Sequence, residues 1–210
     1  MAQMTNLFLF FAVVFGVVVL PGLDMAFVLA SSLNGGRRSG LYAVAGIIAG
    51  GVCHVAIGAL GIAVILNTLP QVFNLVLLVG TAYLGWIGVS LMRSTAGFAS
   101  LDLQMEAHLA SSFRQGMLTN LLNPKAYLFM LAIFPQFVRP AYGPMWSQAL
   151  WMGLIIAATQ AAVYGVIALL AGSSRRWLES NSQWNKRLAQ LIGAVLLLAA
   201  LCSLVGGWRH

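Results

Sequence analysis

Two lone ionisable residues lie inside otherwise apolar stretches of the chain, each beside a proline, a residue that breaks helices. Asp24 ends the sequence Pro21-Gly22-Leu23-Asp24, and Lys125 ends Asn123-Pro124-Lys125. Because proline lacks a backbone N–H, it leaves a carbonyl one turn earlier without its donor. The two motifs therefore combine opposite charges with free backbone groups, which suit the ammonium and carboxylate of a small zwitterion. We expect a substrate site formed by Asp24, Asn123, Lys125, Pro21, Gly22 and Pro124.

The same two charges could instead bind each other. Asp24 lies ten residues before Asn34, and Lys125 lies eleven residues after Arg114. At 1.5 Å per helical residue, both are about 15 Å from the same polar boundary. Either charge alone costs about 2.5–3.5 kcal/mol at that depth, so each needs a partner. A buried salt bridge between Asp24 and Lys125 is therefore the alternative to a substrate site.

Further polar residues lie inside apolar runs. Histidine changes charge near neutral pH, so His54 is, with Asp24, a candidate for proton coupling. A neutral histidine that bonds a neighbouring helix is the other interpretation. Gln160 and Tyr164 are four residues apart and share a helix face. These two residues and Tyr83 are candidates for lining a pathway, with hydrogen bonding between helices as the alternative.

The composition requires lipid as the solvent. Of the 210 residues, 60% are hydrophobic and only 7% are charged, which is too few to cover a soluble core. Apolar runs of about 20 residues or more cross a bilayer as helices, and the alternating strands of a membrane barrel are absent from the sequence. We predict an all-α integral membrane protein with six transmembrane helices, at about 5–32, 41–66, 71–92, 116–138, 145–172 and 188–207.

The distribution of Lys and Arg predicts the orientation in the membrane. Three predicted loops, 33–40, 93–115 and 173–187, contain eight of the 11 basic residues. The opposite side has only Arg139 and Arg209. We therefore place the three loops in the cytoplasm and both termini outside. Basic loops against anionic lipid account for the net charge of +7, so nucleic acid is not an expected partner.

The longest polar stretch divides the chain into two halves of three spans. Residues 1–92 form the first half, residues 93–115 a cytoplasmic linker, and residues 116–210 the second half. Because each half has an odd number of spans, the second enters the membrane from the opposite side, as in inverted repeats. The first helix of each half carries a proline break. Gly46 and Gly50 permit close helix packing, either inside the bundle or in a homodimer.

Several segments, in order along the chain, resemble motifs of a known family. Pro21-Gly22-Leu23-Asp24 is similar to a first-span P-G-P motif, and residues 32–40 (SLNGGRRSG) to a turn of small residues and arginine. Residues 80–88 (GTAYLGWIG) are similar to a third-span G-x-x-Y-L stretch. Residues 122–126 (LNPKA) and 134–137 (FPQF) are similar to a fourth-span motif. Together they resemble the LysE/RhtB family of amino-acid exporters. Leu23 departs from the pattern, because the family commonly has a second proline there.

The resemblance implies a multi-pass secondary transporter of the bacterial inner membrane. It implies efflux of amino acids or close derivatives from the cytoplasm, in exchange for protons. The two halves would rock around a site at the midplane of the bilayer, so that the site opens to each side in turn.

Other classes of function fit the residues of the spans less well. A metal carrier would gather His, Cys or several carboxylates, whereas Cys53 and His54 are adjacent and point to different helix faces. The spans contain no Ser/His or paired-Asp arrangement and the chain has no P-loop, so we expect no enzyme, metal site or cofactor. Two alternatives to an amino-acid exporter are a carrier for another small solute or metal ion and a membrane scaffold that transports nothing.

Overall fold

The computed structural model of the protein describes residues 2–59, 70–93 and 109–207, and all regular structure in these ranges is helical. The elements are α1 (Ala2–Val19), α2 (Leu23–Ala59), α4 (Pro70–Arg93), α5 (Leu109–Leu121), α6 (Pro124–Leu128), the π-helix η2 (Phe129–Ile133), α7 (Phe134–Phe137), the 3-10 helix η3 (Pro140–Tyr142), α8 (Met145–Ser180) and α9 (Ser182–Gly207). Within this part of the chain, three stretches are long and apolar enough to cross a membrane: Ala2–Val19, Leu23–Ala59 and Met145–Ser173. The predicted all-α class is thus confirmed for the described residues.

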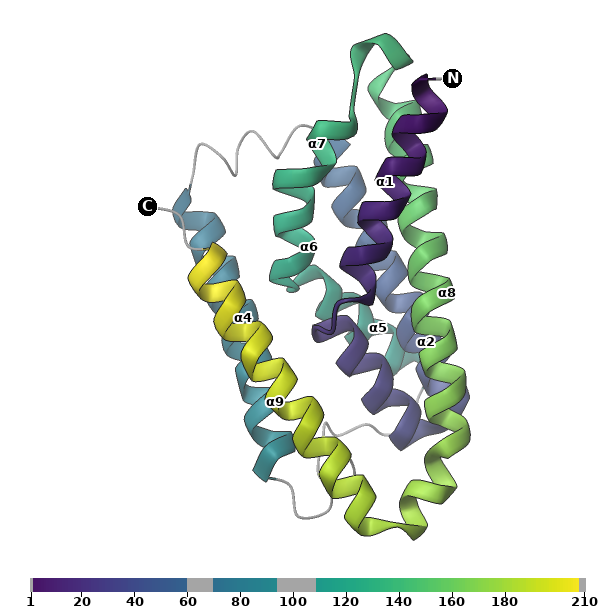
Figure 1. The fold of residues 1–210 in the computed structure, drawn as a ribbon, viewed down its shortest axis with the longest axis vertical. Helices are drawn as coiled ribbons and strands as arrows, with labels where there is room; N and C mark the ends of the chain where they lie inside the picture. Colours follow the sequence, from purple (N-terminus) through teal and green to yellow (C-terminus); the bar gives the residue numbers. More distant parts are fainter. Residues whose placement is uncertain (1, 60–69, 94–108, 208–210) are drawn as a thin grey trace.

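Helix α2 turns back on itself at Gly36. A straight helix of its 37 residues would be about 55 Å long, well beyond the thickness of a bilayer core. Gly36 has φ 76° and ψ −173°, which glycine adopts without the steric cost of a side chain. Figure 1 shows residues 23–35 continuing downward from α1, and residues 37–59 running back up. The reversal falls inside the predicted loop 33–40.

Prolines interrupt the first and fourth predicted spans. Helix α1 ends at Val19 and α2 begins at Leu23, with Pro21 between them. Helix α5 ends at Leu121 and α6 begins at Pro124. The chain thus has helix ends, with their exposed backbone groups, in the middle of two apolar runs.

A second irregularity in the fourth span was not predicted. In η2 the N–H of Phe134 donates to the carbonyl of Phe129, five residues earlier. The next residue, Pro135, has no N–H to continue the regular four-residue pattern. A π segment at this point lets the helix proceed while it shifts the register of its side chains.

Close backbone packing places α5 directly against α2. A side chain at Gly46 would overlap the backbone carbonyl of Phe113, and one at Gly116 would overlap the carbonyl of Ala43. Gly50 likewise faces Asn120 of α5. The pair Gly46 and Gly50 therefore serves packing inside the bundle, and it holds the end of α5 next to the middle of α2.

The helices form one bundle with a pair of helices at its side. Helix α2 packs against α5 and α8, and α1 packs against α8. Helices α4 and α9 pack mainly against each other, as Figure 1 shows at the left. Large apolar side chains face outward, including Phe8, Leu170 and Val205, as expected for a surface surrounded by lipid.

Some helices extend past the apolar runs. Helix α8 continues to Ser180 and α9 begins at Ser182, whereas the apolar runs cover 145–172 and 188–207. Polar residues can continue a helix once it leaves the hydrocarbon, because its backbone hydrogen bonds remain internal. The end of the predicted span 41–66, the turn after it and most of the predicted linker lie outside the described residues.

Candidate functional site

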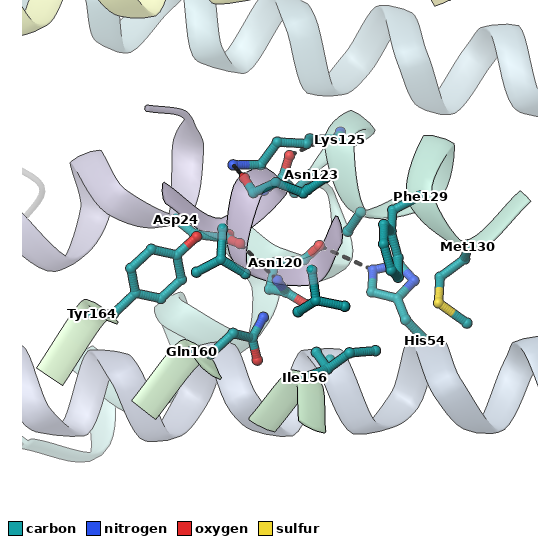
Figure 2. Close-up of a pocket in the computed structure, with 15 residues that line it drawn as sticks. Asp24, His54, Asn120, Asn123, Lys125, Phe129, Met130, Ile156, Gln160 and Tyr164 are labelled. Carbon is teal, nitrogen blue, oxygen red and sulfur yellow. Dashed lines mark hydrogen bonds between the residues drawn. The ribbon is translucent and has the colours of Figure 1, made fainter. Parts of the chain in front are cut away.

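The two helix breaks meet at a cavity, which we call the central cavity. It has a volume of about 50 Å³, enough for a few water molecules. Seven apolar residues and Gly51 form part of its wall: Val14, Val17, Val18, Ala126, Phe129, Met130 and Ile156. Its polar residues are Asp24, His54, Asn120, Asn123, Lys125, Gln160 and Tyr164. They come from α2, α5, α6, α8 and the residue that precedes α6 (Figure 2).

Asp24 is the buried carboxyl group of the cavity. It lies in the first turn of α2 and its side chain is 3% exposed. Its Oδ2 accepts a hydrogen bond of 2.9 Å from Nδ2 of Asn120. In Figure 2 the ring of Tyr164 stands beside it, with the hydroxyl turned toward the carboxyl group. The start of a helix is a favourable place for a carboxylate, because unpaired backbone N–H groups gather there.

Lys125 does not form an ion pair with Asp24 in this structure. Its Nζ donates to the carbonyl of Val17 at 3.1 Å and to that of Leu20 at 2.9 Å. These carbonyls lie at the broken end of α1. The predicted alternative of a direct salt bridge is therefore not what the geometry shows, since each charged group bonds to other partners.

Asn123 fixes the backbone around Lys125. It is the N-cap of α6, and its side-chain oxygen accepts from the backbone N–H of Lys125 at 3.0 Å. Pro124 occupies the first turn of α6, where the missing N–H is not needed. The Asn-Pro-Lys sequence thus restarts the helix after its break and fixes the backbone of Lys125 at the start of α6.

His54 is joined to the same break. Its Nε2 lies 3.1 Å from the backbone carbonyl oxygen of Asn120. Its ring packs edge-on against the ring of Tyr127, with the two ring centroids 4.7 Å apart. The bond to a neighbouring helix fits the interpretation of a neutral histidine. It also leaves His54 on the cavity wall, so its role in proton coupling stays a prediction.

Three buried oxygen atoms at the cavity have no hydrogen-bond donor within the described part of the chain. They are Oδ1 of Asp24, Oδ1 of Asn120 and Oε1 of Gln160. Leaving a buried acceptor unpaired costs about 1–3 kcal/mol. Such atoms concentrated at one cavity indicate a place where a ligand or water supplies donors.

The structure brings most of the predicted site residues together, but not all of them. Asp24, His54, Asn123, Lys125, Gln160 and Tyr164 all line the central cavity. The wall of the central cavity does not include Pro21, Gly22 or Pro124, which lie at the helix ends beside it. Gly22 nevertheless lies close to the ammonium of Lys125. Tyr83 belongs to α4, and its side chain lies outside the described residues.

Asn120 is the main site residue that the sequence analysis missed. It is 1% exposed and connects Asp24 to His54, through its side chain and its carbonyl respectively. It lies three residues, or about one helical turn, before Asn123. This spacing of two asparagines in an apolar run was the available signal.

Comparison with known proteins identifies the family. The model of the LysE type translocator family matches residues 14–207, nearly the whole chain. The chain belongs to the LysE type translocator family. It is therefore a multi-pass membrane protein of a transporter family, and the family assignment favours transport over catalysis.

Proteins of several bacteria are similar to this chain. A membrane protein of Vibrio cholerae without an assigned function is 30% identical over 190 residues, covering 90% of this chain and 91% of its own length. The homoserine/homoserine lactone efflux protein of Salmonella typhimurium is 26% identical over 190 residues, covering 90% of each chain. The membrane protein YahN of Escherichia coli is 29% identical, covering 86% of this chain and 81% of its own. No solved structure matches the chain.

Proposed function

We propose that this protein is a secondary transporter that exports amino acids or close derivatives from the bacterial cytoplasm. The central cavity carries the proposal, because two broken helices meet there around a buried carboxyl group, an ammonium and three unpaired acceptors. A relative whose name describes homoserine and homoserine lactone efflux supports the same class of substrate.

The polar atoms of the cavity suit the two ends of such a substrate. An ammonium has three N–H donors, and the unpaired oxygens of Asp24, Asn120 and Gln160 are three acceptors. The opposite end of the substrate would face Lys125. Two of the donors of the lysine are used by backbone carbonyls, which leaves the third for a carboxylate or a carbonyl.

We infer six spans arranged as two inverted repeats. Residues 23–35 continue the first span after its break, residues 37–59 form the second, and α5 to α7 form the fourth. In such a repeat the first, second and third spans correspond to the fourth, fifth and sixth. Exchanging the two halves therefore turns the contact between the first and fifth spans (α1 and α8) into the contact between the fourth and second spans (α5 and α2). The contact between the second and fifth spans (α2 and α8) is left unchanged by the exchange. The same is true of the contact between the third and sixth spans (α4 and α9). These are the main helix contacts of the described structure, which supports the repeat.

Alternating access would open the cavity to each side in turn. The cavity is smaller than an amino acid, so transport requires the halves to move apart. Toward the start of α1, Phe10 packs against Phe129, Phe134 and Phe137, with ring centroids 5.2–6.2 Å apart. On the other side, α2 and α5 are in close contact at Gly46. Protons would drive the cycle through Asp24 and His54.

The proposed location is the inner membrane, with both termini outside the cytoplasm. The start of α1 and the end of α9 both point toward the upper end of the bundle in Figure 1. The reversal of α2, the end of α4 and the start of α9 lie toward the lower end in Figure 1. The distribution of basic residues assigns that end to the cytoplasm.

The test is efflux from vesicles containing purified protein. The vesicles would be loaded with a mixture of amino acids and homoserine lactone, a pH gradient imposed, and the released solutes identified by mass spectrometry. The wild-type protein should release a selected subset. Gln160→Leu should require roughly ten- to hundredfold more substrate, since a hydrogen bond to a charged group contributes about 1.5–3 kcal/mol.

The matched control is Gln3→Leu, a change on the exposed start of α1, which should behave like the wild type. If folded and correctly oriented wild-type protein released none of these solutes, the cargo would be another small solute or the protein a scaffold. Equal efflux by Gln160→Leu and wild type would place substrate binding elsewhere.

A further inference from the structure

The ammonium of Lys125 is bound by backbone rather than by a carboxylate. Its Nζ is within hydrogen-bond distance of two carbonyl oxygens, at Val17 and Leu20. No ion pair joins it to Asp24, although both line the central cavity. The direct hydrogen bonds of the lysine ammonium are therefore made with the end of α1.

The two carbonyls are available because of Pro21. In a regular helix the carbonyl of Val17 accepts from the N–H of the residue four positions later, which here is a proline without an N–H. The carbonyl of Leu20 belongs to the segment between α1 and α2, and no backbone N–H of the described residues donates to it. The end of a helix also carries partial negative charge. In the apolar interior of a membrane such carbonyls need a donor from the protein.

The surrounding backbone is shaped to admit this donor. A side chain at Gly22 would have its Cβ 3.2 Å from the Nζ of Lys125, so the absence of a side chain there allows the close approach. The main chain of Lys125 is held by the side chain of Asn123 at the start of α6. One residue thus connects the break in the first span to the break in the fourth.

We propose that the carbonyls of Val17 and Leu20 form a binding site for a primary ammonium, and that Lys125 is its built-in occupant. Lys125 acts as a positioning residue that holds the ends of two broken helices together. This site is separate from the acceptors of Asp24, Asn120 and Gln160, which were assigned to the substrate. The inference therefore goes beyond the proposed function and does not depend on which solute is carried.

The proposal is tested by supplying the ammonium from solution. Lys125→Ala removes the ammonium and its stem, which should lower the Tm of the purified protein by about 5 °C or more. Methylammonium chloride should then recover at least about half of that loss, because a ligand that binds only the folded state stabilises it. Tetramethylammonium chloride has the same charge but no N–H donor, and it should recover nothing.

Three comparison proteins exclude indirect effects. Lys125→Met lacks the ammonium but keeps the volume of the stem, so it should be destabilised without being rescued by methylammonium. The wild type, and Lys186→Ala on the exposed side of α9, should show no response to methylammonium. An unchanged Tm of Lys125→Ala, or an equal response of all four proteins, would overturn the proposal.

A second comparison applies even if Lys125→Ala alone does not fold. Pro21→Ala restores an N–H that can bond the carbonyl of Val17 and thereby replace the lysine. The change Lys125→Ala should then lower the Tm less in the Pro21→Ala background than in the wild type. Equal losses in both backgrounds, or failure to fold in both, would show that the lysine does not act through these carbonyls. None of these measurements uses a substrate, so their outcome is independent of the efflux assay.

Discussion

Asp24 occupies the position in the cavity where a positive group would be most strongly bound. Its side chain is almost fully buried, one oxygen accepts from Asn120, and the other has no donor within the described residues. A charge that lies in the membrane interior is costly and is usually retained for a function. A substrate ammonium or a proton bound at the unpaired oxygen would reduce that cost. The substrate and the proton would therefore compete for Asp24.

Replacing Asp24 by asparagine should therefore uncouple transport from protons. Asp24→Asn keeps the size of the side chain but removes its charge and its ability to exchange a proton. Substrate-dependent proton flux into vesicles, followed with a pH-sensitive dye, should fall by about tenfold or more, given about 1.5–3 kcal/mol for a hydrogen bond to a charged group. The control is Glu179→Gln, near the end of α8, which should retain the flux. Wild-type flux in Asp24→Asn would remove Asp24 from the coupling mechanism.

The sequence allowed the charged site residues to be selected but not their partners. Asp24 and Lys125 are conspicuous because ionisable residues are rare in apolar runs, and the structure places both at one cavity. The carbonyls that bind Lys125 could not be predicted, because their position depends on how the end of α1 lies against α6. Asn120 was missed because an asparagine in a span is less unusual than a charge.

At the scale of the elements, the breaks in two spans were predictable and their detailed geometry was not. Pro21 and Pro124 indicated the ends of α1 and the start of α6, since proline cannot continue a helix without losing a hydrogen bond. The π segment at Phe129–Ile133 was not apparent. Whether a proline such as Pro135 kinks, ends or widens a helix is decided by the packing around it.

The close contact of α2 and α5 should depend on its glycines. Gly46→Ala would place a methyl group into the backbone of Phe113, and overpacking of this kind costs about 1–3 kcal/mol. Thermal unfolding in detergent should show a clear decrease of Tm. Gly16→Ala is the matched control, because the space beside Gly16 on α1 is open and alanine favours the helix by up to about 1 kcal/mol. Equal effects of the two changes would contradict the packing described for α2 and α5.

For the whole molecule, hydrophobic runs indicated which segments are helical better than they indicated where each helix ends. The run at 5–32 contains two helices separated by a break, and α8 continues well beyond its apolar part. The arrangement of the helices followed less from the sequence, because the pairing of α4 with α9 depends on side-chain shape along whole helix faces. The two prolines did predict a break in the first and in the fourth predicted span, and the equivalence of the two breaks in an inverted repeat stays a proposal.

The orientation of the molecule can be tested with single cysteines. In a background with Cys53 and Cys202 replaced by serine, Gln3→Cys and Lys186→Cys would each provide one exposed thiol. A membrane-impermeant maleimide added to intact cells should label Gln3→Cys, and it should label Lys186→Cys only after the cells are permeabilised. This follows from placing the basic loops in the cytoplasm. The reverse labelling pattern would mean that the protein has the opposite orientation in the membrane, and the proposed direction of transport would then be uptake.

The central claim is that solute crosses the membrane through the central cavity, and filling the cavity tests it most directly. Ile156 lines the cavity, while Leu154 on the same helix is 52% exposed on the outer surface. Ile156→Trp and Leu154→Trp would be reconstituted, shown to be folded, and compared for efflux of the solute that the wild type releases. Our account predicts that Ile156→Trp abolishes efflux and that Leu154→Trp retains it. Efflux at the wild-type rate by folded Ile156→Trp would contradict the cavity as the transport route.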